Sequence, residues 1–342
     1  MRKLKSLAPG LLLCLGIAIP AWFLGKAVPI IGSPVFGILL GMAIASVFSS
    51  AFSKIRPWLD DGIKYTSKKI LQYSIILLGF DMNLFNVLNV GGQSLAVMLF
   101  TISSSFIVAY GVGKALKLDG KTTTLIGVGT SICGGSAIAA TAPVIQAEDA
   151  EVAHAISTIF LFNIVAVFLF PPLGRLLGMS DEGFGMWAGT AINDTSSVVA
   201  ASSAWSSAAG NDAALKFATI VKLTRTLMIV PIVLALAIYR TRKSAREEGG
   251  AGFPFAKVFP WFVLGFAAAA LLNTFAGIPA SVARALFTLG KFMIVMAMTA
   301  IGLNTNIKKL LANGFGPIFL GLCCWLAVAS TSLLVQMLTK MW

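Results

Sequence analysis

The feature that most constrains this chain is a succession of apolar segments, each long enough to cross a membrane, joined by short charged loops. A membrane-spanning helix needs about 20 mainly apolar residues. The sequence predicts eleven spans, at 8–25, 33–52, 68–86, 93–114, 122–145, 153–175, 183–205, 214–239, 257–275, 283–303 and 316–338. Only 11% of the residues are charged, against about 25% in soluble domains. The expected fold is a single all-α membrane domain covering 1–342, with one hydrophilic linker at 240–256.

The basic residues of the loops predict the orientation of the chain. With the N-terminus in the cytoplasm, these spans place nineteen bases inside: Arg2, Lys3, Lys5, Lys54, Arg56, Lys64, Lys68, Lys69, Lys114, Lys117, Lys121, Arg175, Arg240, Arg242, Lys243, Arg246, Lys257, Lys308 and Lys309. The outside loops keep few bases, and one of them carries Glu148, Asp149 and Glu151 alone. Since bases collect on the cytoplasmic side, we expect an N-in, C-out protein of the bacterial inner membrane. The net charge of +13 is then explained by the basic loops of a protein in the lipid bilayer, and no nucleic acid partner is expected.

Several function classes lack the residues that they need. The four cysteines lie in apolar segments without paired spacing, so neither disulfides, nor a metal site, nor a cofactor is expected. A single histidine leaves no acid–base constellation for an enzyme. No phosphate-binding loop or soluble nucleotide domain is present for a primary pump. The class that remains is a transporter that needs none of these groups.

Two stretches rich in small and polar residues interrupt the apolar spans. GTSICGGSAIAATA (Gly129–Ala142) and GTAINDTSSVVAAS (Gly189–Ser202) match at an offset of sixty residues. Glycine destabilises a helix, and unpaired backbone is tolerated at membrane depth only beside protein or a water-filled cavity. Both stretches are therefore expected to be helices that break, although close helix packing through small residues also fits the pattern. If both were full spans they would run in the same direction, so the similarity is either convergent or one copy is re-entrant.

A second internal similarity, at an offset of 223, joins 77–92 to 299–315. By the loop charges, the first copy leaves the membrane on the outside and the second on the inside. Such an inverted repeat is the usual construction of secondary transporters, whose discontinuous helices carry the substrate site. The sequence predicts this architecture here.

Few ionisable residues lie at membrane depth, where they are costly and commonly functional. Asp194 lies in the second stretch, and Lys222 and Arg225 lie three residues apart on the next span. These residues could form an ion pair that only locks the helices, or bind an anion, or couple transport to sodium or a proton through Asp194. The predicted substrate site comprises Thr130, Ser131, Gly134, Gly135, Ser136, Asn163, Asn193, Asp194, Thr195, Ser196, Lys222 and Arg225.

The two stretches, with IFLFN before Pro171 and KFATIVKLTRTLMIVP after the second stretch, resemble the YeiH-type family of bacterial membrane proteins, described as sulfate exporters. The resemblance covers about residues 10–340. It implies an inner-membrane secondary transporter related to the bile-acid symporter and cation/proton antiporter superfamily. In that fold two unwound helices cross near the bilayer centre, and a core domain moves against a panel domain. Where the family carries His-Asp, this chain has Asn193-Asp194.

The expected function is export of a small anion, sulfate or a related oxyanion, by alternating access. Lys222, Arg225 and Lys291 outnumber Asp194, which favours an anion. The alternatives are a sodium- or proton-coupled cation antiporter or symporter that uses Asn193 and Asp194, and an anion channel. The expected partners are the small anion, a coupling sodium ion or proton, and the lipid bilayer. A homodimer is one open alternative for the assembly.

Overall fold

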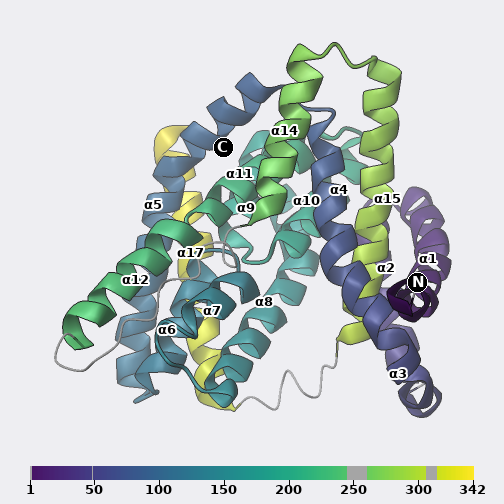
Figure 1. Ribbon diagram of the computed structural model, residues 1–342. Helices are drawn as coiled ribbons and strands as arrows, with labels where there is room; N and C mark the ends of the chain where they lie inside the picture. Colours follow the sequence, from purple (N-terminus) through teal and green to yellow (C-terminus); the bar gives the residue numbers. More distant parts are fainter. Residues whose placement is uncertain (1, 48, 245–259, 306–313) are drawn as a thin grey trace.

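The computed structural model describes residues 2–47, 49–244, 260–305 and 314–342, and all regular structure in these ranges is helical (Figure 1). The helices are α1 (Arg2–Ala27), α2 (Ser33–Val47), α3 (Ser49–Tyr65), the π-helical turn η1 (Thr66–Ile70), α4 (Leu71–Gly79), α5 (Leu84–Ala115), α6 (Gly120–Ser131), α7 (Gly135–Thr141), α8 (Asp149–Leu176), α9 (Asp181–Ala191), α10 (Thr195–Ala209), α11 (Ala213–Leu227), α12 (Ile229–Ser244), α14 (Trp261–Phe275), α15 (Ala280–Asn304) and α17 (Phe315–Thr339). Most of the predicted linker 240–256, and Asn306 with its neighbours in the second repeat, lie outside the described residues.

Six stretches of the described helices are long and apolar enough to cross a membrane: Ser6–Ala27, Leu84–Ala115, Asp149–Leu176, Ala213–Leu236, Ala280–Asn304 and Phe315–Thr339. Two shorter apolar stretches, Ser33–Ser46 and Trp261–Phe275, accompany them. Large apolar side chains lie exposed on these helices; on α5, for example, Phe100 is 60% and Ile107 is 70% exposed. Such a surface suits lipid, and the chain is a multi-pass membrane protein. The described residues do not confirm the eleven full spans of the prediction.

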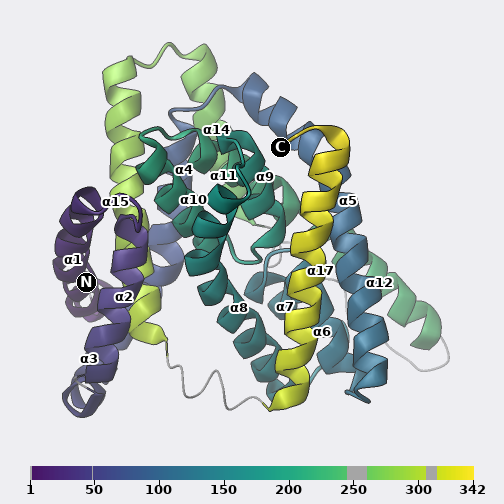
Figure 2. The ribbon, with the colours of Figure 1, turned by 180° about the vertical axis from the view of Figure 1, so that it is seen from behind.

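The helices are arranged in two bundles (Figures 1 and 2). In the first bundle, α1–α4 pack with α14 and α15. In the second bundle, α5–α11 pack with α17. The bundles touch chiefly where α10 lies against α2 and α15, and where α14 lies against α5. Gly32, with a φ of +80°, allows the α1–α2 turn to approach α10 closely, because a Cβ there would lie 2.7 Å from Ala204 Cα.

The second bundle contains two broken helical hairpins, α6–α7 and α9–α10. The starts of α6 and α8 lie together, since Lys121 Nζ is 4.0 Å from Glu151 Oε2. In the first hairpin, a Cβ on Gly129 would lie 2.9 Å from Ile138 Cδ1, so α7 folds back against α6. In the second hairpin, Trp205 Nε1 near the end of α10 donates to Asp181 Oδ1 at the start of α9 (2.6 Å). Each hairpin therefore begins and finishes at one end of the molecule.

The two hairpins enter from opposite ends. Helix α8 has 28 residues and is about 42 Å long at 1.5 Å per residue. Its first turn carries Glu151 beside Lys121, whereas Arg175 in its last turn lies 5.8 Å from the Trp205 ring. We call the end of the molecule at the start of α8 the Lys121 end. The opposite end is called the Asp212 end, after Asp212 in the segment that joins α10 to α11. In Figure 1, α6–α7 occupy the lower half and α9–α10 the upper half.

This arrangement shows broken helices at both predicted stretches and decides against full spans at 122–145 and 183–205, which the sequence left open beside a re-entrant copy. Gly134 has a φ of +69°, which no helix can continue, and Ile192 is extended (φ −88°, ψ 131°). As a result Glu151 lies at the same end as Lys121, whereas the prediction placed these two residues on opposite sides. Arg175 lies beside Trp205 at the Asp212 end, whereas the prediction placed it on the same side as Lys121. The span predicted at 68–86 also differs, because α3, η1 and α4 form a continuous helical run that stops at Gly79.

Candidate functional site

The breaks of the two hairpins, Ile132–Gly134 and Ile192–Asp194, meet inside the second bundle. A Cβ added to Gly134 would lie 3.8 Å from Asp194 Cβ and 3.7 Å from Asn163 Nδ2. Asn163 comes from α8 and is 2% exposed. Its Oδ1 accepts hydrogen bonds from the backbone N–H groups of Asn193 and Asp194, each at 3.1 Å. We call this meeting point of α7, α8, α10 and the two breaks the crossing.

Two cations on α11, Lys222 and Arg225, hold the helix ends at the crossing, and both side chains are fully buried. Lys222 Nζ donates to the carbonyls of Ile132 (2.8 Å) and Ile192 (3.0 Å), one from each break. Arg225 Nε donates to the carbonyl of Ser131 (2.8 Å). Its two terminal nitrogens donate to the carbonyls of Thr130 and Thr190, and Nη1 also reaches Ile192 O (3.4 Å).

These contacts explain why two cations are tolerated in the interior. The last carbonyls of a helix have no partner within it and carry about −0.5 of an elementary charge. The ends of α6 and α9 would therefore leave unpaired carbonyls inside the protein. Lys222 and Arg225 supply donors to both ends at once, so α11 fastens the two hairpins together.

The carboxylate at the crossing serves a different helix end. Asp194 is the N-cap of α10 (φ −89°, ψ 140°), and its Oδ2 accepts from the backbone N–H of Ser196 at 3.0 Å. The Ser196 hydroxyl donates to the same oxygen. An N-cap carboxylate meets the positive end of the helix dipole. The ion pair that the sequence allowed as one alternative is absent, since among the described residues no nitrogen of Lys222 or Arg225 lies within 4.0 Å of Asp194.

Part of the hydrogen-bonding capacity at the crossing is unused. The side chain of Asn193 is fully buried, yet its Nδ2 and Oδ1 have no partner among the described residues. Buried amides are almost always paired, so an unpaired one indicates a place for a ligand or water. Space lies nearby, because a Cβ on Gly135 would meet no atom within 4 Å and Ser136 is exposed. Asp194 itself is partly exposed.

The structure divides the twelve predicted site residues into three groups. Gly134, Asn163, Asn193, Asp194, Thr195 and Ser196 lie at the crossing beside the open positions Gly135 and Ser136. Lys222 and Arg225 reach it from α11. Thr130 and Ser131 contribute carbonyls, because their hydroxyls bond within α6 to Ile126 O and Val128 O.

Two further features bear on the predicted chemistry. Lys291, counted in the sequence among the buried charges, lies away from the crossing and pairs with Asp212 at 2.7 Å. Among the described residues, no group of three or more His, Cys, Asp or Glu side chains could hold a metal ion. Neither the fastening of helix ends by α11 nor this ion pair could be read from residue spacing, because both depend on how the hairpins turn back.

Comparison with known proteins places the chain in a family. A family described as "Conserved hypothetical protein 698" matches residues 9–321. A UPF0324 membrane protein of Streptococcus pyogenes serotype M6 is 53% identical over 100% of this chain and 99% of its own length. The chain belongs to the UPF0324 family of membrane proteins. Other UPF0324 membrane proteins are similar along almost their whole length: that of Streptococcus mutans is 50% identical, covering 97% of both chains, and that of Fusobacterium nucleatum is 48% identical, covering 96% of both. No solved structure matches the chain.

Proposed function

We propose that this UPF0324 protein is a secondary transporter that moves a small anion through the crossing by alternating access. The observation that carries the proposal is the meeting of two broken hairpins from opposite ends around an unpaired amide, Asn193, and two buried cations. Discontinuous helices that meet near mid-depth form the substrate sites of many secondary transporters. The resemblance to the YeiH-type exporters and to the symporter and antiporter superfamily points to the same function.

The two hairpins also support an inverted repeat. Helices α6 and α9 start at opposite ends, so the sixty-residue similarity relates segments that run in opposite directions. The helices that carry the other similarity also lie side by side, since α4 packs against α15 and α5 packs against α17. Repeats of this kind can exchange conformations, which opens the shared site to one side at a time. The first bundle would be the panel and the second bundle the moving core.

The charges at the crossing favour an anion over a cation. Lys222 and Arg225 supply two positive charges and Asp194 one negative charge. The ends of α6 and α9 add about −0.5 each, and the start of α10 adds about +0.5. About half a positive charge therefore remains, and a small anion such as sulfate or a related oxyanion would balance it. Lys222 also occupies the carbonyls of both breaks, which are the groups that an unwound helix would offer to sodium.

The proposed orientation places the N-terminus in the cytoplasm. Helix α1 runs toward the Asp212 end, because Lys26 lines a cavity with Ser207 and Lys291 there. Its start, together with Lys114, Lys117 and Lys121, therefore lies at the Lys121 end. Bases mark the cytoplasmic side, so the Asp212 end would face outward and the C-terminus would lie outside.

In this orientation the structure would correspond to a conformation closed toward the outside. Lys216 pairs with Asp81 at 2.6 Å and Lys291 with Asp212 at 2.7 Å, and each pair joins the two bundles at the Asp212 end. The open positions at Gly135 and Ser136 belong to the hairpin that enters from the Lys121 end. The crossing would thus be reached from the cytoplasm, as export requires. A negative-inside potential drives an anion outward by about 2.3 kcal/mol per charge at 100 mV, so no coupling ion is needed.

A thermal-shift screen of the purified protein tests the proposal. Sulfate, sulfite, thiosulfate, organosulfonates, carboxylates and sodium are compared at constant ionic strength. A ligand at 100 times its Kd stabilises the protein by about 2.7 kcal/mol, so an oxyanion should raise the melting temperature and sodium should not. Asn193→Ala should abolish the shift, whereas Asn86→Ala, at an exposed asparagine of α5, should retain it. Stabilisation by sodium alone would overturn the anion assignment.

A further inference from the structure

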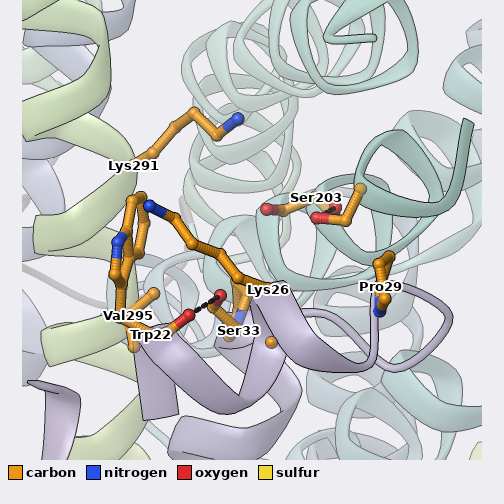
Figure 3. Close-up of a pocket in the computed structure, with 10 residues that line it drawn as sticks. Trp22, Lys26, Pro29, Ser33, Ser203, Lys291 and Val295 are labelled. Carbon is orange, nitrogen blue, oxygen red and sulfur yellow. Dashed lines mark hydrogen bonds between the residues drawn. The ribbon is translucent and has the colours of Figure 1, made fainter. Parts of the chain in front are cut away.

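A cavity lies between the two bundles at the Asp212 end. It has a volume of about 270 Å³ and is lined by residues of α1, α2, α10 and α15, among them Trp22, Lys26, Ser33, Ser203, Ser207 and Lys291. Pockets for small molecules measure roughly 300–1,000 Å³, so this cavity suits a small ligand. Figure 3 shows Lys26 and Lys291 on one side of it and Ser203 on the other.

The lysines give the cavity an excess of positive charge. Lys26 Nζ lies 5.3 Å from the centre of the Trp22 ring, and no carboxylate of the described residues lies within 4.0 Å of it. Lys291 pairs with Asp212 at 2.7 Å. The two ammonium groups and this one carboxylate leave a net charge of about +1, which attracts an anion and repels a cation.

The hydroxyls of α10 supply the groups that orient a ligand. Ser203 is 5% exposed and lines the cavity, and its hydroxyl has no hydrogen-bond partner among the described residues. The Ser207 hydroxyl donates to the carbonyl of Ser203 at 2.7 Å, and its lone pairs remain available. The Ser33 hydroxyl is held by the Trp22 carbonyl at 3.1 Å. Serine hydroxyls that line a cavity opposite two ammonium groups can donate hydrogen bonds to an oxyanion bound there.

Helix α10 connects this cavity to the crossing. Ser203 follows Asp194 by nine residues, which corresponds to about 14 Å along a helix. Ser196, Ser203 and Ser207 are seven and four residues apart, so they lie on one face of α10. Val199, Ala200 and Ala204 belong to the same apolar cluster as Ile38 of α2 and Met298 of α15, so the intervening turns pack against the first bundle. The cavity is thus at the Asp212 end of the contact between the bundles.

We propose that this cavity is a second anion site, which binds a small oxyanion such as sulfate between Lys26, Lys291 and Ser203. Its role as the outward exit site for an exported anion rests on the proposed function; its selectivity for anions does not. An anion bound there competes with Asp212 for Lys291. Its arrival would weaken one of the two ion pairs that hold the bundles together at this end.

The test measures thiol modification at Ser203→Cys by two reagents of equal reactivity and opposite charge. These are the sulfonatoethyl and the trimethylammonioethyl methanethiosulfonates. Background comes from the native chain, whose four cysteines are buried or half-buried. The matched control is Ser281→Cys, on an exposed position of α15. The ratio of anionic to cationic rates should be at least tenfold higher at residue 203 than at residue 281, and millimolar sulfate should slow both reactions at residue 203.

Three charge variants on the Ser203→Cys background sharpen the test. Lys26→Gln should lower the rate ratio severalfold, whereas Arg284→Gln, which removes an exposed charge of α15, should leave it unchanged. Asp212→Asn releases Lys291 and removes one negative charge, so it should raise the ratio. If Ser203→Cys fails to fold, Ser207→Cys replaces it.

The outcomes separate this site from the proposed function. Equal rate ratios at residues 203 and 281, or no change with Lys26→Gln, would overturn the anion site even if the protein transports anions. A high ratio that depends on Lys26, in a protein that moves no anion in proteoliposomes, would retain the site and overturn the transport proposal.

Discussion

Replacing Arg225 by lysine keeps the buried charge and removes the fork that joins the hairpins. The guanidinium donates from three nitrogens to carbonyls of both α6 and α9. A lysine at this position offers one nitrogen, without the planar fork, in place of three, so two of the three carbonyls should lose their partner. Each buried unpaired group costs about 1–3 kcal/mol, which gives a total of about 2–6 kcal/mol. Because the charge is retained, this loss reports the geometry of the fork.

The measurement is thermal unfolding of the purified protein in detergent. A loss of 1 kcal/mol lowers the melting temperature of a long chain by about 2 °C, so Arg225→Lys should lower it by roughly 4–12 °C. The control is Arg284→Lys at an exposed position of α15, where surface substitutions change stability by at most about 0.5 kcal/mol. If both variants melt at the wild-type temperature, Arg225 does not hold the hairpins together.

Three further predictions address the hairpins. Gly134→Ala should lower stability by about 1–3 kcal/mol, because its backbone (φ +69°, ψ −124°) lies in a region that alanine rarely adopts. Gly92→Ala, inside α5 with open space around it, should raise stability by about 0.5–1 kcal/mol. A similar response at both positions would refute the break. Asp119→Ala should cost about 1 kcal/mol at neutral pH, because Asp119 caps α6 by accepting from Thr122 N (3.0 Å) and Lys121 N (2.9 Å). These hydrogen bonds, that from Thr122 first, lower the pKa of Asp119 below its ordinary value of 3.8. The stability that the cap contributes is therefore present above pH 3.8 and is lost as the pH falls through the lowered pKa. Melting curves in which Asp119→Ala stays equally less stable than the wild type in strong acid would contradict this. Finally, cysteines at Lys117 and Gln146, which flank the α6–α7 hairpin, should be labelled from the same side of sealed vesicles; labelling from opposite sides would restore a full span.

The sequence predicts the helical membrane fold because composition and segment length settle it. It also predicts which stretches break, since Gly134 and Asn193-Asp194 stand where an apolar helix would carry larger apolar residues. The direction after each break is a tertiary property. A charge count along the loops cannot distinguish a hairpin from a full span, so it places Lys121 and Glu151 on opposite sides although their side chains lie 4.0 Å apart.

The candidate site is predicted less completely than the fold. Spacing brings Lys222 and Arg225 to one helix face, and charge suggests Asp194 as their partner. The structure pairs them with backbone carbonyls instead, because helix ends are polar groups that leave no mark in residue type. The Lys26 cavity escapes prediction for a related reason. Its residues come from four helices, and only the helical spacing of Ser196, Ser203 and Ser207 hints at it.

Anion flux in proteoliposomes tests the central claim most directly. Vesicles containing wild-type protein, Asn193→Ala or Asn86→Ala are loaded with labelled sulfate, sulfite, thiosulfate or an organosulfonate, and efflux is followed under an imposed membrane potential. The wild type and Asn86→Ala should release at least one of these anions at equal rates, and Asn193→Ala should release it at least tenfold more slowly. Equal efflux from Asn193→Ala and the wild type, or no efflux above that of empty liposomes for any of them, would contradict anion transport through the crossing.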